Sequence, residues 1–230
     1  MFVLKDKRVL VIGLGASGVA ACELSCSQGA KVVAVDNADT ASQRSHADKL
    51  RALGVEVRLG QMALPDQPFE LAVLSPGVPM AGELAQEVAR REIPLIGELE
   101  LGWQQSCCRS VAITGTNGKT TTTELVERVL THNHLKTVAA GNIGLPLCSV
   151  SGRTKELDWL TLEVSSFQLE AIQAFRPAVA VLMNITPDHL DRYASMREYA
   201  AAKERVFENQ RPGDFAVVNA DCPDLISHLD

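Results

Sequence analysis

The sequence predicts an α/β protein made of two consecutive domains, each built on a mostly parallel sheet. Three observations lead to this fold class. Short apolar runs alternate with stretches of helical periodicity, which is the pattern of strands joined by crossover helices. Two glycine-rich loops, at residues 13–18 and 115–120, each lie between an apolar run and a helical pattern. A polar stretch over residues 104–109 separates the two series, so we expect domains over residues 1–105 and 106–230.

The elements of each series follow from this alternation. In the first series, strands are expected over residues 8–13, 31–36, 55–59, 71–75 and 93–96, and helices over residues 17–28, 41–53 and 82–91. In the second series, strands are expected over residues 110–114, 137–140, 159–164, 179–184 and 215–219, and helices over residues 119–131 and 195–209. The apolar positions Leu125, Val129 and Leu130 are expected to face the core. A further helix is expected to begin within residues 224–229, in mid-alternation, which we interpret as the mark of a fragment.

Composition argues against several classes of protein. The 230 residues carry a net charge of −6 with no basic run, which disfavours a nucleic-acid-binding groove. No apolar stretch reaches the roughly 20 residues that a membrane helix needs. The six cysteines form no Cys-x-x-Cys pair, so reduced thiols in a cytoplasmic protein are expected. Residues 5–21 resemble an export signal in charge and hydropathy, but their glycine spacing is that of a nucleotide-binding turn.

The first glycine loop follows a predicted strand and opens a predicted helix. It reads Gly13-Leu14-Gly15-Ala16-Ser17-Gly18, the pattern in which three glycines permit a tight turn, the approach of a phosphate and close helix packing. Free amides at the helix N-terminus favour an anionic group. Asp36 ends the next strand, 18 residues after Gly18, where it can accept a hydrogen bond from a ribose or a base. Taken alone, this loop predicts a nicotinamide or flavin enzyme, with a turn that binds nothing as the alternative.

The second glycine loop predicts a nucleoside triphosphate site. It reads Gly115-Thr116-Asn117-Gly118-Lys119-Thr120-Thr121, in which backbone amides can cradle phosphates, Lys119 can neutralise their charge and the Thr120 hydroxyl suits Mg²⁺. Its spacing is more compact than G-x-x-x-x-G-K-[ST], whose first glycine would fall at Ile113. A chain that binds ATP here does not need NAD in its first domain. A nucleotide-like substrate in that domain therefore reconciles the two loops.

Further segments carry a resemblance to a known family. They are Ser75-Pro76-Gly77, Gly141-Asn142-Ile143-Gly144, LEVSSFQLE at residues 162–170, NITPDHLDRY at 184–193 and AAAK at 200–203. With the second loop, they resemble the Mur ligases over essentially the whole chain, and most closely the members that add D-glutamate. The resemblance implies a Rossmann-like UDP-sugar-binding domain, then a P-loop-type ATP-binding central domain that is truncated, with the family's C-terminal domain absent. Another Mur ligase, a ligase like folylpolyglutamate synthase and a non-catalytic nucleotide-binding module remain alternatives; the glycine-turn domain disfavours the folate enzyme.

The resemblance also implies an activity and the residues that serve it. It implies an ATP-dependent amide ligase of peptidoglycan synthesis, which adds D-glutamate to UDP-N-acetylmuramoyl-L-alanine through an acyl phosphate. ATP is expected at residues 115–121, and the catalytic side chains implied are Lys119, Glu163, His189 and Lys203. The UDP-sugar is expected to contact Gly15, Ala16, Ser17, Asp36, Asn37, Ser75, Gly77 and Asn142, with Asp36 and Asn37 facing the uracil.

By the same resemblance, two Mg²⁺ ions are expected, with Thr120, Glu163, His189 and Lys203 as ligands. Composition alone makes Lys203 a solvated helix lysine, whereas the resemblance makes it a carbamate derived from CO₂. That modification replaces a cation with two anionic oxygens, which suit Mg²⁺. We expect a monomer that is inactive as a fragment, because the family's third domain contributes most of the D-glutamate site.

Overall fold

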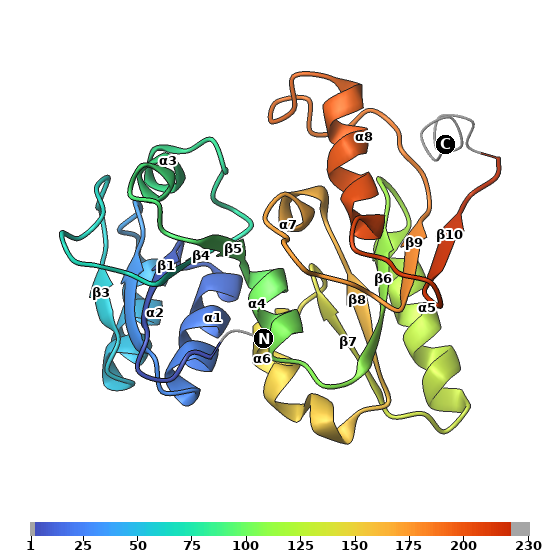
Figure 1. Cartoon of the computed structure of the whole chain (residues 1–230), viewed down its shortest axis with the longest axis horizontal. Coiled ribbons are helices and arrows are strands. Elements are labelled where there is room, and N and C mark those ends of the chain that lie inside the picture. The colour runs from blue at the N-terminus through green and yellow to red at the C-terminus, as the bar shows by residue number, and fades with distance from the viewer. Residues whose placement is uncertain (1–2, 222–230) are drawn as a thin grey trace. The chain divides into compact units, whose positions relative to one another are not determined.

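The computed structural model describes residues 3–221 and confirms the α/β fold class (Figure 1). The chain forms two compact units, each with a five-stranded parallel sheet. The first unit holds the described residues up to Gln105 together with Pro146–Gly152 and Ala171–Gln173. The second unit holds Ser106–Leu145, Arg153–Glu170 and the described residues from Ala174 onward. The expected helix within residues 224–229 lies outside the described residues.

The first unit places its glycine turn at the centre of its sheet. The strand order is β3-β2-β1-β4-β5, so the order reverses between β1 and β4, where parallel sheets of this kind bind ligands at the carboxyl ends of the strands. Apolar side chains cover both faces of the sheet in two buried clusters. The elements are β1 (Arg8–Ile12), α1 (Ala16–Ser27), β2 (Lys31–Val35), α2 (Ala41–Ala52), β3 (Glu56–Arg58), β4 (Leu71–Leu74), α3 (Glu83–Arg90), β5 (Leu95–Gly97), α4 (Glu98–Gln104) and α6 (Leu147–Val150).

Helix α4 has no counterpart among the elements expected from the sequence, and it carries two buried acids. The Glu98 Oε1 atom accepts a hydrogen bond from the backbone amide of Cys148 at 2.7 Å, and burial raises the pKa of Glu98 to about 7. The Glu100 Oε2 atom accepts a hydrogen bond from the backbone amide of Gln173 at 2.9 Å. These two bonds tie the segments around Cys148 and Gln173, distant in sequence, into the first unit.

The second unit has the strand order β10-β9-β6-β8-β7, with its phosphate loop at the end of the central strand β6. The predicted helix over residues 195–209 is shorter, because α8 ends at Glu204 and a 3₁₀ turn follows it. The elements are β6 (Arg109–Thr114), α5 (Lys119–His132), β7 (Thr137–Gly141), β8 (Trp159–Glu163), α7 (Ser166–Leu169), β9 (Val179–Leu182), α8 (Met196–Glu204), η2 (Arg205–Phe207) and β10 (Phe215–Val218). The 3₁₀ turn η1 (Ser151–Glu156) begins in residues assigned to the first unit and ends in residues assigned to the second.

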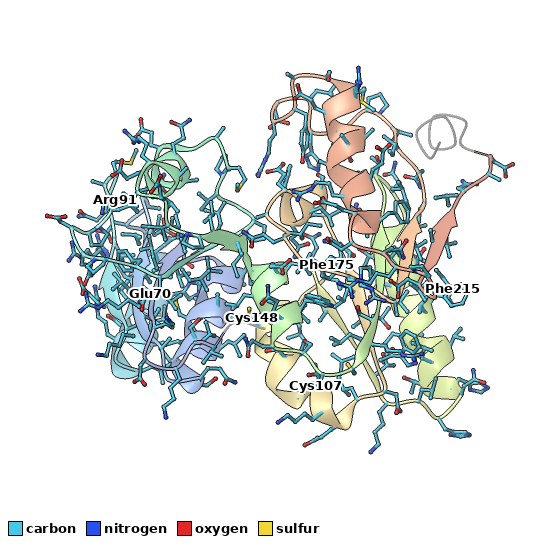
Figure 2. The ribbon with its side chains drawn as sticks, viewed as in Figure 1. Glu70, Arg91, Cys107, Cys148, Phe175 and Phe215 are labelled. Carbon is cyan, nitrogen blue, oxygen red and sulfur yellow. The ribbon has the colours of Figure 1, made fainter. Side chains whose placement is uncertain are left out.

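The inward face of α5 is not the one expected from the sequence. Leu125 and Val129 are 59% and 53% exposed, so their expected core positions are wrong, and Leu130 is only partly buried. The buried residue of α5 is Thr123. Leu125 comes two residues later and points to nearly the opposite side of the helix, because each residue turns a helix by about 100°. On the outer strand β10, Phe215 is likewise 66% exposed (Figure 2).

None of the helices within residues 3–221 is both long and apolar enough to cross a membrane. The five cysteines in this part of the chain are free, and Cys222 lies outside it.

Candidate functional site

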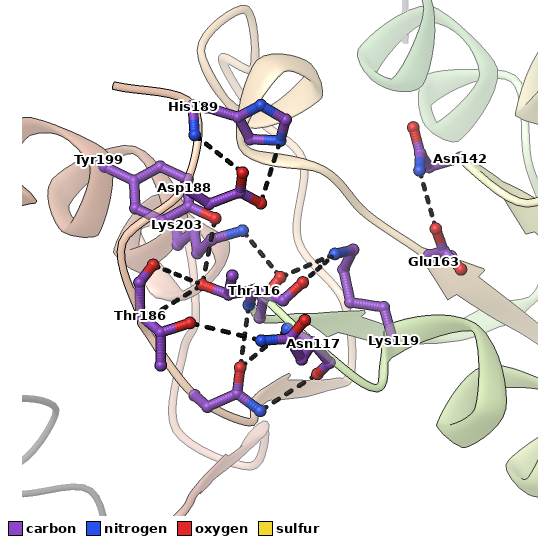
Figure 3. A network of polar contacts seen from close by, with 12 residues as sticks. Thr116, Asn117, Lys119, Asn142, Glu163, Thr186, Asp188, His189, Tyr199 and Lys203 are labelled. Carbon is purple, nitrogen blue, oxygen red and sulfur yellow. Dashed lines mark hydrogen bonds and ion pairs between the residues drawn. The ribbon is translucent and has the colours of Figure 1, made fainter. Parts of the chain in front are cut away.

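The phosphate loop, residues 115–118, joins β6 to α5 and includes Thr116 and Asn117 (Figure 3). The side chain of Asn184, which follows β9, holds this loop by hydrogen bonds. The Asn184 Oδ1 atom accepts hydrogen bonds from the backbone amides of Thr116 at 3.1 Å and Asn117 at 2.9 Å, while its Nδ2 atom donates to the Asn117 carbonyl at 3.1 Å. The next three amides, at positions 118–120, have no partner among residues 3–221. The start of α5 is therefore the part of the expected phosphate cradle that remains open to an anion.

The buried Thr116 side chain also holds the phosphate loop, through hydrogen bonds to Thr186 and Tyr199. Its hydroxyl donates to the Thr186 carbonyl at 3.2 Å, accepts from the Thr186 amide at 3.0 Å and lies 3.2 Å from the Tyr199 hydroxyl. Tyr199 is buried and belongs to α8, one helical turn before Lys203. The loop is thus fixed to the segment after β9 and to α8, and both carry expected site residues.

Two lysine ammonium groups meet at one carbonyl of the phosphate loop. Lys119 donates from its Nζ atom to the carbonyl oxygens of Gly115 at 2.9 Å and Thr116 at 2.8 Å, and Lys203 donates to the same Gly115 oxygen at 2.9 Å. Lys203 is 2% exposed, which rules out the surface position that composition alone gives it. Burial, and then the charge of Lys119, lower the pKa of Lys203 to about 7. Lys119 makes this part of the loop attractive to anions, and Lys203 adds to that attraction only while it is protonated.

Glu163 occupies the carboxyl end of β8, where its carboxylate is held from two sides. Its Oε2 atom accepts a hydrogen bond from the Thr120 hydroxyl at 2.6 Å, and its Oε1 atom accepts one from the Asn142 side-chain amide at 2.8 Å. The neighbouring strand approaches closely because of Gly141, where an added Cβ would lie 2.2 Å from the Glu163 carbonyl oxygen. Carboxylate and hydroxyl oxygens are the hard donors that Mg²⁺ prefers, and Mg²⁺ keeps several waters or phosphate oxygens besides. The chemistry of this pair therefore fits Mg²⁺ beside a bound phosphate.

His189 lies in the loop after β9 with a left-handed backbone, φ +52°. Its amide donates to the Asp188 Oδ1 atom at 2.9 Å, and its Nε2 atom lies 3.5 Å from Asp188 Oδ2. The ring packs 4.7 Å from the ring of Phe167 and 6.1 Å from that of Tyr199, measured between centroids. The side chain of His189 remains 44% exposed, so one side of the imidazole is open to a ligand.

The expected metal ligands are only partly assembled. Thr120 and Glu163 are in contact, whereas neither Lys203 nor His189 contacts Glu163 in the described part of the chain. No group of three His, Cys, Asp or Glu side chains within residues 3–221 is arranged to hold a metal ion. A Mg²⁺ ion at Glu163 would thus need oxygens from a nucleotide, from water or from a modified Lys203.

In the first unit, two side chains hold the glycine turn by hydrogen bonds: Asp36, which follows β2, and His46, which belongs to α2. Both oxygens of Asp36 accept backbone bonds, from Leu14 at 2.6 Å and from Ala38 at 2.8 Å, and His46 contacts the Leu14 carbonyl at 2.8 Å through Nδ1. The third glycine of the motif is required by packing, because a Cβ at Gly18 would lie 1.8 Å from the Gly13 carbonyl oxygen. The buried Asp36 therefore holds the turn through both of its carboxylate oxygens.

The remaining expected substrate contacts of this unit lie around the same turn. Ser75 is buried beside it and donates its amide to the Ile12 carbonyl at 2.9 Å. Gly15 and Ala16 are exposed at its surface, and Ser17 is half-buried. Asn37 is exposed, and a Cβ at Gly77 would meet nothing within 4 Å, so both positions border open space.

Four polar residues of the site were not among the predicted site residues: Asn184, Thr186, Asp188 and Tyr199. The first three belong to the NITPDHLDRY segment, whose position after a strand was a usable signal. Tyr199 precedes Lys203 by four residues, a spacing that places both on one helix face.

The fold consists of two α/β units, one with a glycine turn at the start of α1 and one with a glycine-rich loop at the start of α5. Two family models match, one described as "Mur ligase middle domain" over residues 113–230 and one as "Mur ligase MurD-like, N-terminal domain" over residues 7–97. The chain therefore belongs to the Mur ligase family, as its motifs suggested.

Curated relatives agree with this membership. The chain is 46% identical over 221 residues to a UDP-N-acetylmuramoylalanine–D-glutamate ligase of Koribacter versatilis, covering 95% of this chain and 48% of the relative. It is 46% identical over 225 residues to the ligase of the same name from Pelotomaculum thermopropionicum, covering 96% and 50%. The chain thus spans about half the length of these relatives.

Two solved structures share the fold at low sequence identity. One is the UDP-N-acetylmuramate:L-alanyl-gamma-D-glutamyl-meso-diaminopimelate ligase of Neisseria meningitides, with a TM-score of 0.63, 20% identity, and coverage of 98% of this chain and 75% of that one. The other is the UDP-N-acetylmuramate-alanine ligase MurC of Thermotoga maritima, with a TM-score of 0.55, 21% identity, and coverage of 97% and 51%.

Proposed function

We propose that this chain carries the UDP-sugar site and the phosphate- and metal-binding side chains of a ligase that joins D-glutamate to UDP-N-acetylmuramoyl-L-alanine at the expense of ATP. The observation that carries the proposal is the arrangement at the start of α5, where Lys119 lies on the carbonyls of the phosphate loop and the Thr120 hydroxyl contacts Glu163. Amide formation from a carboxylate requires transfer of a phosphoryl group between two anions, which depends on concentrated positive charge. The relatives named above bear the corresponding ligase name.

In this proposal, the ATP phosphates bind at the start of α5. Lys119 exchanges the carbonyl oxygens of Gly115 and Thr116 for phosphate oxygens, which are stronger acceptors because they are charged. Thr120 and Glu163 would hold a Mg²⁺ ion, which would supply positive charge to neutralise the phosphates. Asn142 holds the Glu163 carboxylate from the side opposite the Thr120 hydroxyl, because its side-chain amide bonds Oε1 and the hydroxyl bonds Oε2.

Lys203 serves this site as a carbamate. With a pKa of about 7, roughly half of the Lys203 side chains are neutral amines at neutral pH. The amine nitrogen forms a bond to the carbon of CO₂ and releases one proton to solvent, leaving an anion with two oxygens. Those oxygens, together with His189, are suited to a second Mg²⁺ ion, and the anion removes the repulsion between Lys203 and Lys119.

The glycine turn of the first unit binds the UDP-sugar. The backbone amides at the start of α1 have no side-chain cap, so they favour an anionic group such as a diphosphate. Ser75 borders the same turn. The exposed Asn37 is free to contact the base, whereas Asp36 keeps the turn in place. We further propose that the protein works as a monomer in the cytoplasm, in the synthesis of peptidoglycan precursors.

Calorimetric titration of the 230-residue chain tests the assignment of ligands. UDP-N-acetylmuramoyl-L-alanine should bind, and ATP with Mg²⁺ should bind independently and be lost in Lys119→Ala. NAD and a folate, titrated in parallel, should give no heat of binding. Tight binding of NAD without binding of the UDP-sugar would overturn the substrate assignment, and binding of the folate would favour the other ligase class.

A further inference from the structure

The loop that carries His189 is a short turn folded back on that residue. The backbone amides of Arg192 and Tyr193 both donate to the His189 carbonyl oxygen, at 3.0 Å and 3.1 Å. At φ +52°, the His189 backbone lies in the left-handed region, which a residue with a Cβ adopts only when its surroundings enforce it. Contacts outside the turn must therefore hold this conformation.

Those contacts converge on one carboxylate. Glu170 follows α7 and accepts a hydrogen bond from the Arg192 guanidinium at 2.6 Å through Oε2 and one from the Tyr193 hydroxyl at 2.5 Å through Oε1. The Glu170 and Arg192 side chains are each 17% exposed, so this ion pair is far less screened by solvent than a surface pair. Each oxygen of Glu170 thus holds one of the two residues that close the turn.

The same helix also supplies the surface on which the imidazole rests. The Arg192 guanidinium lies 3.9 Å from the centre of the Phe167 ring, and that ring lies 4.7 Å from the His189 ring. Phe167 precedes Glu170 by three residues, so the two project from one side of α7. The Arg205 guanidinium fixes the end of α7 by donating to the carbonyls of Leu169 at 2.7 Å and Glu170 at 2.6 Å.

We propose that Glu170 is a positioning residue that sets the orientation of the His189 imidazole through Arg192 and Tyr193. Without the carboxylate, the turn loses the two side-chain hydrogen bonds that Glu170 accepts, the guanidinium leaves the Phe167 ring and the imidazole is free to rotate. For the metal role of His189, this inference rests on the proposed function. The orientation itself is a property of the chain without any ligand.

The test compares Glu170→Gln with Asp214→Asn. Glutamine keeps the size of Glu170 but loses the charge that holds Arg192. The control breaks a second ion pair between an arginine and a carboxylate, Arg176–Asp214 at 2.6 Å. Arg176 precedes β9 and Asp214 precedes β10, so this pair lies at the amino ends of these strands, whereas His189 follows the carboxyl end of β9. Nuclear Overhauser contacts between the Phe167 and His189 rings are measured in the ligand-free chain, and broadening of the His189 ring signals is measured on addition of Mn²⁺ with ATP.

We expect the ring-to-ring contact to be lost in Glu170→Gln, weakened in Tyr193→Phe, which removes one anchor, and unchanged in Asp214→Asn. The broadening of the His189 ring signals by Mn²⁺ with ATP should be smallest in Glu170→Gln, intermediate in Tyr193→Phe and equal to that of the wild type in Asp214→Asn. An unchanged contact in both Glu170→Gln and Tyr193→Phe would overturn the proposal. If Glu170→Gln does not fold, Tyr193→Phe decides the question alone. If the wild-type chain keeps the ring contact but its His189 signals are unaffected by Mn²⁺ with ATP, the metal role in the proposed function fails while the positioning role stands.

Discussion

Replacement of Lys203 by methionine should stabilise the second unit at neutral and acidic pH. Lys203 is 2% exposed, and its pKa is lowered from 10.5 to about 7, first by burial and then by Lys119. The Lys203 ammonium group therefore loses its proton more readily in the folded chain than in the unfolded chain. Between about pH 7 and pH 10.5, the unfolded chain binds more protons, so the free energy of unfolding of the wild type rises with pH in this window. Below the window, the full cost of the buried charge is present.

The size of this cost follows from the two pKa values. One pKa unit corresponds to about 1.4 kcal/mol, so a pKa near 7 in place of 10.5 costs the folded state about 4 to 5 kcal/mol below pH 7. Methionine removes this cost and keeps most of the side-chain volume. It also removes the hydrogen bond to the Gly115 carbonyl, a loss of about 1 to 2 kcal/mol. The expected net stabilisation at pH 6 is therefore about 2 to 4 kcal/mol, and it changes to a net loss of about 1 to 2 kcal/mol near pH 10.5, where only the missing hydrogen bond remains.

Urea denaturation at pH 6, 8 and 10 measures this difference. In a Trp103→Phe background, the fluorescence of Trp159 at the start of β8 reports on the second unit alone. The buffers are depleted of CO₂, so that the amine and not a carbamate is compared. The control is Lys155→Met, which removes an exposed lysine from the same unit and should show no such dependence on pH. A stability difference that does not change between pH 6 and pH 10 would refute the reasoning.

Three further substitutions have distinct expected outcomes. Lys119→Ala should lower the rate of acyl-phosphate formation in a full-length relative by on the order of 100-fold, measured as ADP release, and leave UDP-sugar binding intact. Asn184→Ala removes the side-chain grip on the phosphate loop and should weaken binding of ATP with Mg²⁺ roughly tenfold by calorimetry, since about 1.4 kcal/mol is a factor of ten. Gly18→Ala forces a Cβ to within 1.8 Å of the Gly13 carbonyl oxygen, so it should destabilise the first unit by about 2 kcal/mol or more in thermal unfolding. Retained UDP-sugar affinity in Gly18→Ala would contradict the proposed role of the turn.

The sequence was sufficient to predict the elements that carry the two glycine loops. Short apolar runs between helical segments predict every strand of the two sheets, because parallel strands that are buried on both faces are continuously apolar. They also locate the loops at the carboxyl ends of β1 and β6. Helix α5 shows the limit of this approach, because periodicity reveals an apolar stripe but does not say which side of the helix meets the sheet. Thr123 is buried there, whereas Leu125 and Val129 face outward.

Side-chain partners in the site were less accessible to prediction from the sequence. Asn184 and Thr116 are 68 residues apart, and their contact depends on β9 pairing with β6, an order that the sequence does not reveal. The burial of Lys203 has the same origin, since nothing in α8 distinguishes this lysine from a surface lysine until the helix is packed. Asp36 has a role that was not predicted, because both its oxygens accept hydrogen bonds from neighbouring amides, while its expected contact with the uracil stays a prediction.

These internal contacts have a consequence for how the proposed site would bind ligands. Lys119 is satisfied by loop carbonyls, and Glu163 by Thr120 and Asn142. A buried charge without partners would cost several kcal/mol, so these contacts make the site compatible with a stable fold before any ligand arrives. Binding must then exchange existing hydrogen bonds for stronger ones. The favourable exchange is the one in which a neutral carbonyl or hydroxyl partner gives way to a phosphate oxygen or a divalent cation, because both members of the new pair are charged. Nucleotide affinity should consequently depend more on the charges of Lys119 and Glu163 than on how many groups line the loop.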